Sequence, residues 1–547
     1  MLEITEIPCT LDQGADEEGC LEAGTRETCR LLGIQRSDIL RASLRRKSID
    51  ARKRRDVRFT LSIRLELAEG FDEAAAVERL DECARRRVRV VDAAEPSFPE
   101  PLGRTGAHHA RPVVVGAGCA GLFAALTLAE AGLEPLLIER GEDAGRRSEA
   151  VTRFEATGEL DPESNIQFGL GGAGTFSDGK LNTGTKNPAH RLILQTLVDA
   201  GAPREILWDA KPHIGSDVLP RVVTSLLGRI RALGGAVLFE TRLVDIERDA
   251  AGGIRGIVWE RGGREEHIAC DRLILSCGHS ARDVFELLVR RGFALSRKTF
   301  AMGVRIEHLQ ADIDRAQYGP AAGHPALGAA PYSLVAHLSG GRSVFSFCMC
   351  PGGQVVAAAS ERGGVVTNGA SLHARAGANA NSALLVNVTP EDLPGDDPLA
   401  GIALQRSCER MAFDLGGGTY RAPAQLLGDY LVGIPSTRGG SVTPTYPIGV
   451  AWGSVSPTLP AHVDATLREG IPLLARKLKG FDRHDAVLTG VESRSSSPVT
   501  VLRGRDCVAE GAPGLYPCGE GAGYAGGIMS AATDGIRCAQ ALIAHVA

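Results

Sequence analysis

One glycine motif constrains the fold of this chain more than any other feature. Gly116, Gly118 and Gly121 follow a run of three valines and open an Ala- and Leu-rich segment, Ala120–Ala131. Glycine at the first position permits a tight turn, at the second it lets backbone approach a pyrophosphate, and at the third it allows close helix–strand packing. The N-terminus of such a helix offers free N–H groups and partial positive charge to phosphates. The segment therefore predicts a strand, a turn and a helix that bind a dinucleotide.

An acidic residue occupies the matching position downstream. Glu139 lies 18 residues after Gly121, at the end of a second predicted strand, Glu134–Glu139. An acid at this place accepts hydrogen bonds from ribose hydroxyls, and its charge disfavours an extra 2′-phosphate. Residues 112–139 are thus predicted to form one βαβ unit.

Glycine is also concentrated in two later motifs, within a chain that has 67 glycines among 547 residues. The first, Asn165–Lys180, contains Gly172 and Gly174, and its apolar side chains argue against a flexible surface loop. The second, Gly514–Met529, is followed by a predicted helix, so its glycine turn aims a second helix N-terminus at an anionic group. Three such sites suit a long, extended cofactor better than a mononucleotide.

Charge and cysteine content limit the other function classes. The net charge of −5 is mild, so no DNA partner is expected. A basic run at 41–59 continues into a strand-like alternation, and a solvated or internally paired face explains it better than RNA binding. The 13 cysteines are odd in number and include no Cys-x-x-Cys pair, which predicts a reducing compartment and no metal site.

No targeting or membrane segment is expected. The acidic start lacks the basic and apolar regions of a secretory signal. Residues 112–129 carry no charge, but their clustered glycines indicate a strand, a turn and a helix and not a membrane span. The sequence predicts a cytoplasmic protein and leaves its oligomeric state open.

The predicted fold class is α/β. It comprises a Rossmann-type FAD-binding domain, an inserted α+β substrate domain and a small N-terminal α/β domain. In that N-terminal domain we expect helices at 25–40 and 72–87 and strands at 56–67 and 88–91; further strands are expected at 235–246 and 268–276. The expected boundaries are an N-terminal domain at 1–93, a linker at 94–111, the first part of the FAD-binding domain at 112–290, the inserted domain at 291–490 and the second part of the FAD-binding domain at 491–547.

These motifs carry a resemblance to flavoproteins of the glutathione-reductase type, which have two dinucleotide-binding domains. Within them, the chain is most similar to a bacterial family of FAD-dependent dehydrogenases or oxidoreductases whose biochemical role is mostly undescribed. The resemblance covers nearly the whole chain. It runs through the strings 47–52, 165–180, 211–215, 278–283, 347–353, 495–498 and 519–527.

The resemblance implies an extended FAD with its ADP part on the first glycine motif. It implies that the adenosine ribose lies on Glu139, that Val244 lies beside adenine, and that Gly278 lies in a second FAD-contacting segment. Gly519 and Glu520 would lie beside the ribityl chain and pyrophosphate. Gly527 and Ile528 would place a helix N-terminus at the flavin N1/O2 edge, where it stabilises negative charge on the reduced ring.

The substrate side is less defined by the sequence. Arg305 and Glu307 alternate onto one face of a predicted strand, either as a surface ion pair or as a substrate anchor. Cys348 and Cys350 are either a redox dithiol or buried free thiols, because a Cys-x-Cys disulfide is strained in an extended segment. The remaining weak candidates are His213 and His279 as acid–base groups, and Arg282, Arg494 and Lys211 as anchors.

The predicted function is an FAD-dependent dehydrogenase or reductase that transfers a hydride between a small organic substrate and flavin N5. The sequence has no second strand–G-x-G-x-x-G–helix unit, so NAD(P)H is expected only as a transient reductant. Two alternatives stay open: a flavin-dependent oxidase or monooxygenase, and a flavin-binding protein associated with RNA.

Overall fold

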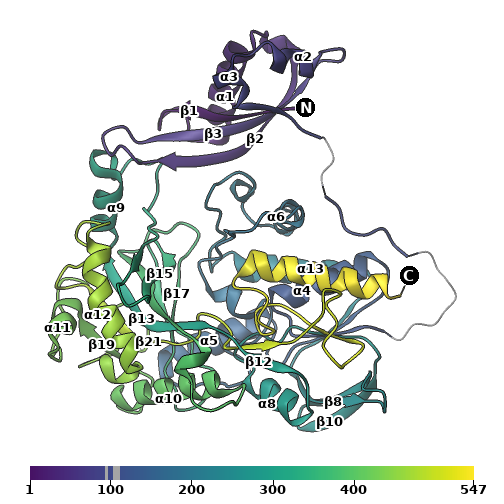
Figure 1. The fold of residues 1–547 in the computed structure, drawn as a ribbon, viewed down its shortest axis with the longest axis vertical. Coiled ribbons are helices and arrows are strands. Elements are labelled where there is room, and N and C mark those ends of the chain that lie inside the picture. Colours follow the sequence, from purple (N-terminus) through teal and green to yellow (C-terminus); the bar gives the residue numbers. More distant parts are fainter. Residues whose placement is uncertain (93–95, 103–110, 547) are drawn as a thin grey trace.

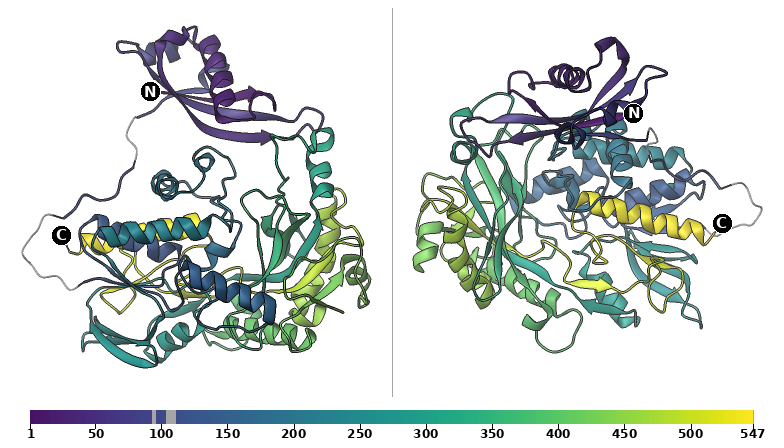
Figure 2. Two further views of the ribbon diagram at one scale, coloured as in Figure 1. Left: turned by 180° about the vertical axis from the view of Figure 1, so that it is seen from behind. Right: turned by 45° about the horizontal axis from the view of Figure 1, so that its top comes forward.

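The computed structural model describes residues 1–92, 96–102 and 111–546, arranged as a small N-terminal unit and a larger body (Figure 1). Figure 2 shows from two further sides that the N-terminal unit sits at one end of the molecule. The predicted linker at 94–111 lies largely outside the described residues.

The N-terminal unit is a four-stranded antiparallel sheet in the order β2-β3-β1-β4. Its β–α–β–β–α–α–β succession agrees with the expected α/β unit. Two strands were not predicted: β1, which contains Glu3 and Glu6 among buried apolar residues, and β2, which carries the basic run. The elements are β1 (Leu2–Cys9), α1 (Glu17–Leu32), β2 (Ile39–Asp50), β3 (Arg58–Leu67), α2 (Glu73–Glu78), α3 (Glu82–Arg85) and β4 (Val88–Val90).

The helices of this unit differ from the prediction. Helix α1 covers Glu17–Leu32 and not 25–40, because Gly33 adopts the left-handed conformation (φ +66°) that ends a helix. The helix expected at 72–87 is two short helices, each begun by its own aspartate cap, Asp72 and Asp81.

A five-stranded parallel sheet, ordered β23-β11-β5-β6-β7, forms the centre of the body. All five strands run in one direction, so the loops that follow them gather at one edge. Helices α4 and α13 pack side by side against this sheet (Figure 1). The elements are β5 (Val113–Val115), α4 (Cys119–Glu130), β6 (Leu136–Ile138), α7 (Leu219–Ala232), β7 (Ala236–Leu238), β11 (Leu273–Leu275), β23 (Leu515–Pro517) and α13 (Ile528–Ala544).

Two predicted strands each divide between two sheets. The strand expected at 235–246 is β7 followed by β8 (Thr241–Arg248), and the positive φ of Glu240 (+54°) marks the turn between them. The strand expected at 268–276 is the end of β10 (Arg264–Ala269) followed by β11. Strands β8, β9 (Ile254–Arg261) and β10 make an antiparallel sheet of their own. Periodicity did not reveal these turns, because apolar residues occur in the strands before and after each of them.

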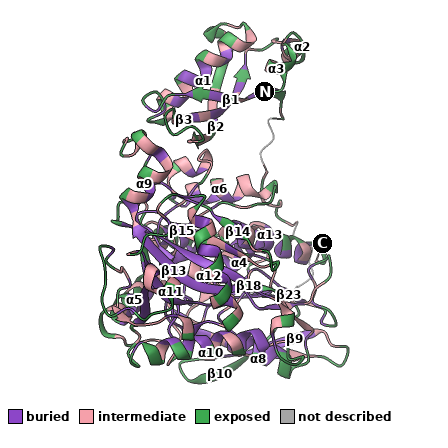
Figure 3. Ribbon diagram, turned by 60° about the vertical axis from the view of Figure 1, so that its left-hand side comes forward, coloured by how far each residue is buried: buried purple, intermediate pink, exposed green. Residues whose placement is uncertain are grey.

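A seven-stranded sheet in the order β14-β15-β18-β13-β21-β19-β20 forms the other half of the body. Its central strands are almost wholly buried (Figure 3), and helix α12 packs against them. The elements are β13 (Phe300–Leu309), β14 (Val335–His337), β15 (Ser343–Cys350), β18 (Asn379–Val388), α10 (Ala400–Leu415), β19 (Ala422–Leu426), β20 (Val450–Trp452), α12 (Ala461–Ala475) and β21 (Val487–Glu492).

Short elements join the two large sheets. Strands β12 and β22 form one antiparallel pair, and β16 and β17 form another. The remaining elements are α5 (Ala144–Thr157), α6 (Ala189–Asp199), α8 (Arg282–Arg290), β12 (Leu295–Arg297), α9 (Gln310–Tyr318), β16 (Gln354–Ala357), β17 (Thr367–Ala370), α11 (Leu427–Val432) and β22 (Val499–Val501).

The predicted fold class is confirmed: a Rossmann-like parallel sheet is combined with further sheets in a mixed α/β chain. Among the described helices, none has the length and apolar character that crossing a membrane requires.

Candidate functional site

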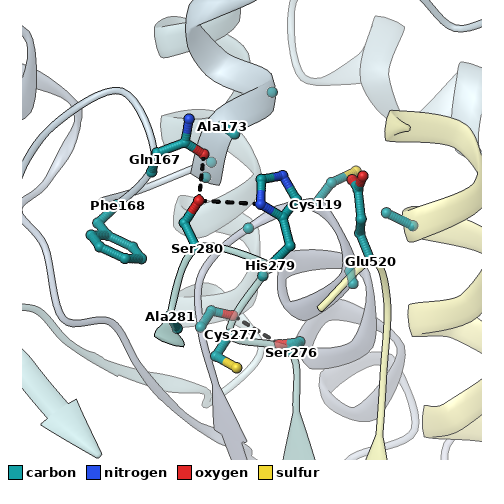
Figure 4. A pocket seen from close by; sticks show the side chains of 18 of the residues that line it. Cys119, Gln167, Phe168, Ala173, Ser276, Cys277, His279, Ser280, Ala281 and Glu520 are labelled. Atoms are coloured by element: carbon teal, nitrogen blue, oxygen red, sulfur yellow. Dashed lines mark hydrogen bonds between the residues drawn. The ribbon is translucent and has the colours of Figure 1, made fainter. Parts of the chain in front are cut away.

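A cavity of about 350 Å³ lies where the carboxyl edge of the parallel sheet meets the seven-stranded sheet (Figure 4). The loops after β5 and β11 and the turn before α13 line one side of it. Side chains from β15, β17 and the end of β21 line the other side: Phe347, Cys348, Asn368, Glu492, Arg494 and Ser495.

The first glycine motif builds the floor of this cavity. Gly116 has φ +97°, and a Cβ there would lie 2.5 Å from the carbonyl oxygen of Ser276 on the neighbouring loop. A Cβ on Gly121 would lie 1.8 Å from the carbonyl oxygen of Gly116, so only glycine lets helix α4 begin so close to the strand. Gly118 lines the cavity itself, and Gly121 lies beneath it.

Two helix N-termini open into the same cavity. Helix α4 begins after Gly118 and α13 begins after Gly527, and neither cap residue supplies a side-chain hydrogen bond to the first N–H groups. A Cβ on Gly278 or Gly527 would meet no protein atom within 4 Å, so the space beside the backbone is open at both. Two helix N-termini that open into one cavity, with Sγ of Cys119 3.3 Å from the carbonyl oxygen of Ile528, fit an anionic dinucleotide such as FAD.

The second glycine motif closes over the first. Gly172 (φ +61°) approaches Gly118 so closely that an added Cβ would lie 3.0 Å from the Gly118 Cα. A Cβ on Gly174 would lie 3.3 Å from Ile528, at the start of α13. The loop is held by Arg147 on α5, a residue that sequence reasoning missed. Its guanidinium is fully buried and donates to five loop carbonyls, those of Asn165, Ile166, Gly169, Leu170 and Gly172.

Glu139 lies in the cavity wall, but its carboxylate already has backbone partners. Oε2 accepts from the N–H of Ala117 at 2.7 Å, and Oε1 accepts from those of Gly141 and Gly169 at 3.0 and 2.9 Å. The side chain therefore ties the two glycine loops together. A carboxylate accepts about four hydrogen bonds, so one acceptor position stays open for a ribose hydroxyl.

The other residues expected to contact the cofactor differ in whether they line the cavity. Val244 is not among the lining residues, whereas Leu243, its neighbour in β8, is. Gly519 lies just behind the wall, where its N–H donates to Asp534 at 2.8 Å. Glu520 lines the cavity, and burial raises the pKa of its carboxyl to about 7.

Of the two candidate histidines, only His279 lines the cavity. Its Nδ1 lies 3.2 Å from Oγ of Ser280, which in turn donates to Oε1 of Gln167 at 3.1 Å (Figure 4). Because the hydroxyl proton goes to Gln167, Nδ1 is the donor and Nε2 of His279 is left as an acceptor. Burial, reinforced by Arg494 and Arg282, lowers the His279 pKa to about 3, so the ring is neutral.

His213 lies outside the cavity lining. Its Nε2 lies 2.9 Å from the carbonyl oxygen of His373, and the two rings stack with centroids 5.3 Å apart. Burial lowers the pKa of His213. Lys211, another candidate anchor, also lies outside the lining.

The three candidate anchor arginines are buried and paired with carboxylates. Arg282 and Arg494 both form bidentate contacts with Glu409, at 2.8–2.9 Å. Burial raises the pKa of Glu409, but the two arginines outweigh it and lower that pKa far below its usual range. Arg494 also lines the cavity, whereas Arg282 lies behind it.

Arg305 corrects the expectation of a surface ion pair. Its side chain is fully buried and pairs with Glu492 on the neighbouring strand, with Nε 2.9 Å from Oε2. Glu307 is equally buried, but it accepts from Asn379 and Thr445. The two residues share one face as predicted, and tertiary packing gives each a different partner.

The two cysteines of β15 lie at a bulge. Pairing with β18 passes from Phe347↔Ala383 to Cys350↔Asn381, so one extra residue is inserted, and Cys348 has φ +43°. Cys348 lines the cavity and Cys350 is fully buried behind it. The strand is therefore not extended at the point where the sequence suggested strain.

A lysine that sequence reasoning did not select lies beside these thiols. Lys180 ends the second glycine motif, and its Nζ lies 3.8 Å from Sγ of Cys350 and 2.9 Å from Oδ2 of Asp178. Burial raises the pKa of Asp178, but Lys180 and Arg375 outweigh it and lower that pKa to about 2. The position of Lys180 within the motif was the signal that could have identified it.

A separate cluster has the residue types of a metal site. Cys518, Asp534 and Cys538 are buried, with ligand atoms within 4.8 Å of one another. The guanidinium of Arg503 already pairs with Asp534 at 3.0 Å and lies 3.1 Å from Sγ of Cys538. A positive charge therefore occupies the position that a cation would need.

Three segments of the chain match known families. Residues 299–495 match "FAD-dependent protein, C-terminal domain-like", residues 114–173 match an NAD(P)-binding Rossmann-like domain, and residues 1–66 match a domain of unknown function. Together with the cavity geometry, these matches define the chain as a flavoprotein, and FAD is its cofactor.

The chain is 44% identical over 545 residues to an uncharacterized protein of Clostridium beijerinckii, a match that covers 99% of this chain and 98% of the relative. It belongs to the same protein family as that relative.

Two solved structures show a distant likeness. Flavin-dependent brominase Bmp2 is 12% identical, with a TM-score of 0.35 and 80% of each chain covered. The 3-ketosteroid-delta4-(5alpha)-dehydrogenase of Rhodococcus jostii RHA1 is 13% identical, with a TM-score of 0.32, and the match covers 81% of this chain and 98% of that one. Likenesses at this level do not identify a reaction.

Proposed function

We propose that this protein is an FAD-dependent oxidoreductase, a dehydrogenase or reductase that moves a hydride between a small organic substrate and flavin N5. The observation that carries the proposal is the second wall of the cavity. Side chains from the seven-stranded sheet, among them Phe347, Asn368 and Arg494, line the same space as the glycine loops. A protein that only stored the cofactor would not need a polar wall facing it.

The bound flavin supplies a two-electron acceptor at N5. Around it, His279 offers a neutral Nε2 that accepts a hydrogen bond from the substrate, with Ser280 and Gln167 fixing the ring. Arg494 keeps its charge against Glu409 and extends to the cavity, where it favours a polar or anionic substrate group.

The relation to two-dinucleotide-binding-domain flavoproteins of the glutathione-reductase type is part of this proposal, as are the expected domain boundaries. NAD(P)H is proposed only as a transient reductant, because the sequence has one glycine motif of the dinucleotide-binding kind. A cytoplasmic location is likewise a proposal.

An anaerobic screen of small metabolites and of NAD(P)H, read as bleaching of the bound flavin, tests the proposed reaction. We expect one chemical class to bleach the flavin faster than the rest. Bleaching by dithionite alone, with no metabolite active, would contradict the proposal. Mixing the reduced protein with O₂ in a stopped-flow instrument separates a dehydrogenase, which reoxidises slowly, from an oxidase or monooxygenase.

The RNA alternative needs its own measurement. The basic run lies on β2 and the β2–β3 hairpin, where Lys47 packs over the Phe59 ring and Arg52 pairs with Asp50. Retention of RNA that weakens with salt, and that is lost when residues 1–93 are deleted, would favour that alternative.

A further inference from the structure

The bulge in β15 brings two thiols together at the wall of the flavin cavity. Cys348 lines the cavity beside Lys180 and Glu520, whereas Cys350 is fully buried behind it. Sγ of Cys350 lies 3.2 Å from the backbone carbonyl oxygen of Cys348, so the chain folds back on itself within three residues. A β-bulge re-aims side chains in this way, which a regular strand does not do.

The two cysteine side chains also influence each other's pKa. The neighbouring Cys350 thiol lowers the pKa of Cys348, whereas Cys348 and burial raise the pKa of Cys350. Two cations favour a thiolate at this place. Lys180 lies 3.8 Å from Sγ of Cys350, and Arg305 donates to the Cys348 carbonyl oxygen at 3.1 Å. A thiolate that contacts a second thiol is the reactive arrangement of a dithiol redox pair.

The spacing permits a disulfide. Residues two apart on a strand have Cα atoms separated by roughly 6.6 Å, at the upper end of the 4.4–6.8 Å that disulfides span. Side-chain direction therefore decides whether the bond can form. In an extended strand the objection to Cys-x-Cys stands, but the bulge and the left-handed backbone of Cys348 mean that this segment is not extended.

We propose that Cys348 and Cys350 form a two-electron redox pair that exchanges electrons with the flavin. In the oxidising direction for the thiols, the S–H bond of Cys350 breaks and a bond forms between the two sulfurs. The electron pair and the proton pass to oxidised FAD, which is thereby reduced by two electrons. The reverse step regenerates the thiolate of Cys348 and the thiol of Cys350. The inference rests on the FAD cofactor and not on the identity of the substrate.

Counting electrons tests this directly. The air-oxidised holoprotein is titrated anaerobically with dithionite, and the equivalents consumed are divided by the FAD bound. We expect four electrons per FAD in the unmodified protein, two for the flavin and two for the disulfide. Cys348→Ser and Cys350→Ser should each take up two.

Cys408→Ser is the matched control, because Cys408 is also buried but lies on α10, outside the cavity lining. It should take up four electrons. Two electrons in the unmodified protein, or four in both the Cys348 and Cys350 variants, would overturn the proposal. This titration does not involve the proposed substrate reaction. If that reaction does not occur, only the metabolite screen will show it.

Peptide mapping gives an independent readout if a serine variant loses FAD. The oxidised, alkylated protein is digested without reductant, and the peptide that contains Cys348 and Cys350 is weighed. A mass two hydrogens below that of the dithiol, with neither cysteine alkylated, supports the pair. Full alkylation of both cysteines in the air-oxidised protein would overturn it.

Discussion

The parallel sheet and the seven-stranded sheet each supply one wall of the cavity, and they do so with different parts of the chain. The first wall is backbone: glycine turns, free N–H groups and two helix N-termini. The second is side chains, several of them buried charges such as Glu492 and Arg494 that are neutralised by partners distant in sequence. A cavity wall made of backbone needs closely spaced glycines, whereas a wall made of side chains needs strands that the fold brings together.

The largest effect is expected for a substitution at Gly121, in the backbone wall. In Gly121→Ala the new Cβ would lie 1.8 Å from the Gly116 carbonyl oxygen, so helix α4 must move away from the strand. We expect the purified protein to lose its bound FAD, measured as flavin absorbance per protein, because the phosphate-binding turn is displaced. Gly228→Ala on α7, where a Cβ meets nothing within 4 Å, should retain its FAD. Full flavin content in Gly121→Ala would contradict the backbone origin of this wall.

Substitutions in the second wall should destabilise the protein by leaving buried charges without their partners. Glu409→Ala leaves Arg282 and Arg494 buried without their shared carboxylate. Removing one partner of a buried pair costs about 3–5 kcal/mol, so the free energy of unfolding in urea should fall by that amount. In contrast, Glu82→Ala breaks only the exposed pair with Arg86 and should change it by less than about 0.5 kcal/mol. Equal losses of unfolding free energy in the two variants would show that burial does not determine the energy of these charge pairs.

The carboxyl group of Glu520, in the cavity lining, should make the stability of the protein depend on pH. Its folded pKa of about 7 lies above the usual value of 4.5, so the neutral form is favoured by folding. The stability that this provides is complete below about pH 4.5 and is lost as the pH rises through 7. We expect this loss to amount to roughly 1–3 kcal/mol in the FAD-free protein, allowing for partial solvent exposure. Glu520→Gln should flatten the dependence of Tm on pH between 5 and 8, and an unchanged slope would refute the assignment.

Gly278 gives the smallest expected effect and separates folding from binding. Its φ is +74°, so Gly278→Ala should cost about 1 kcal/mol of backbone strain. No protein atom lies within 4 Å of the added methyl, which extends into space beside the cavity wall. FAD affinity, measured by fluorescence titration of the FAD-free protein, should fall more than the strain explains. A loss of affinity no greater than the loss of stability would mean that the methyl does not meet the cofactor.

Much of the backbone wall could be predicted from the sequence, because its determinants are local. The spacing of Gly116, Gly118 and Gly121, the run of valines before them and Glu139 after them all lie within one βαβ unit. The roles of these glycines follow from the missing Cβ. The adenine contact expected for Val244 stays a prediction; at the bulge between Leu243 and Asp245, Leu243 and not Val244 lines the cavity.

Tertiary structure alone decided the side-chain wall. The partner of Arg305 is Glu492, 187 positions away, and no periodicity of one strand indicates a pairing across two. Arg147 and Lys180 were missed for the same reason, since their partners are loop carbonyls and the thiol of Cys350. The relation between Cys348 and Cys350 depends on a bulge, which the alternation of residues in a strand does not reveal.

The sequence by itself determined that this chain binds a dinucleotide, because a glycine turn, a helix and an acid at fixed spacing are sufficient to define that site. Only the tertiary structure decided which arginines are buried and paired, and that Cys348 and Cys350 lie at a bulge in the cavity wall. The physical reason is range. Which backbone conformations are sterically allowed depends on a few neighbouring residues. The energy of a buried charge or thiol depends on groups that only folding brings close.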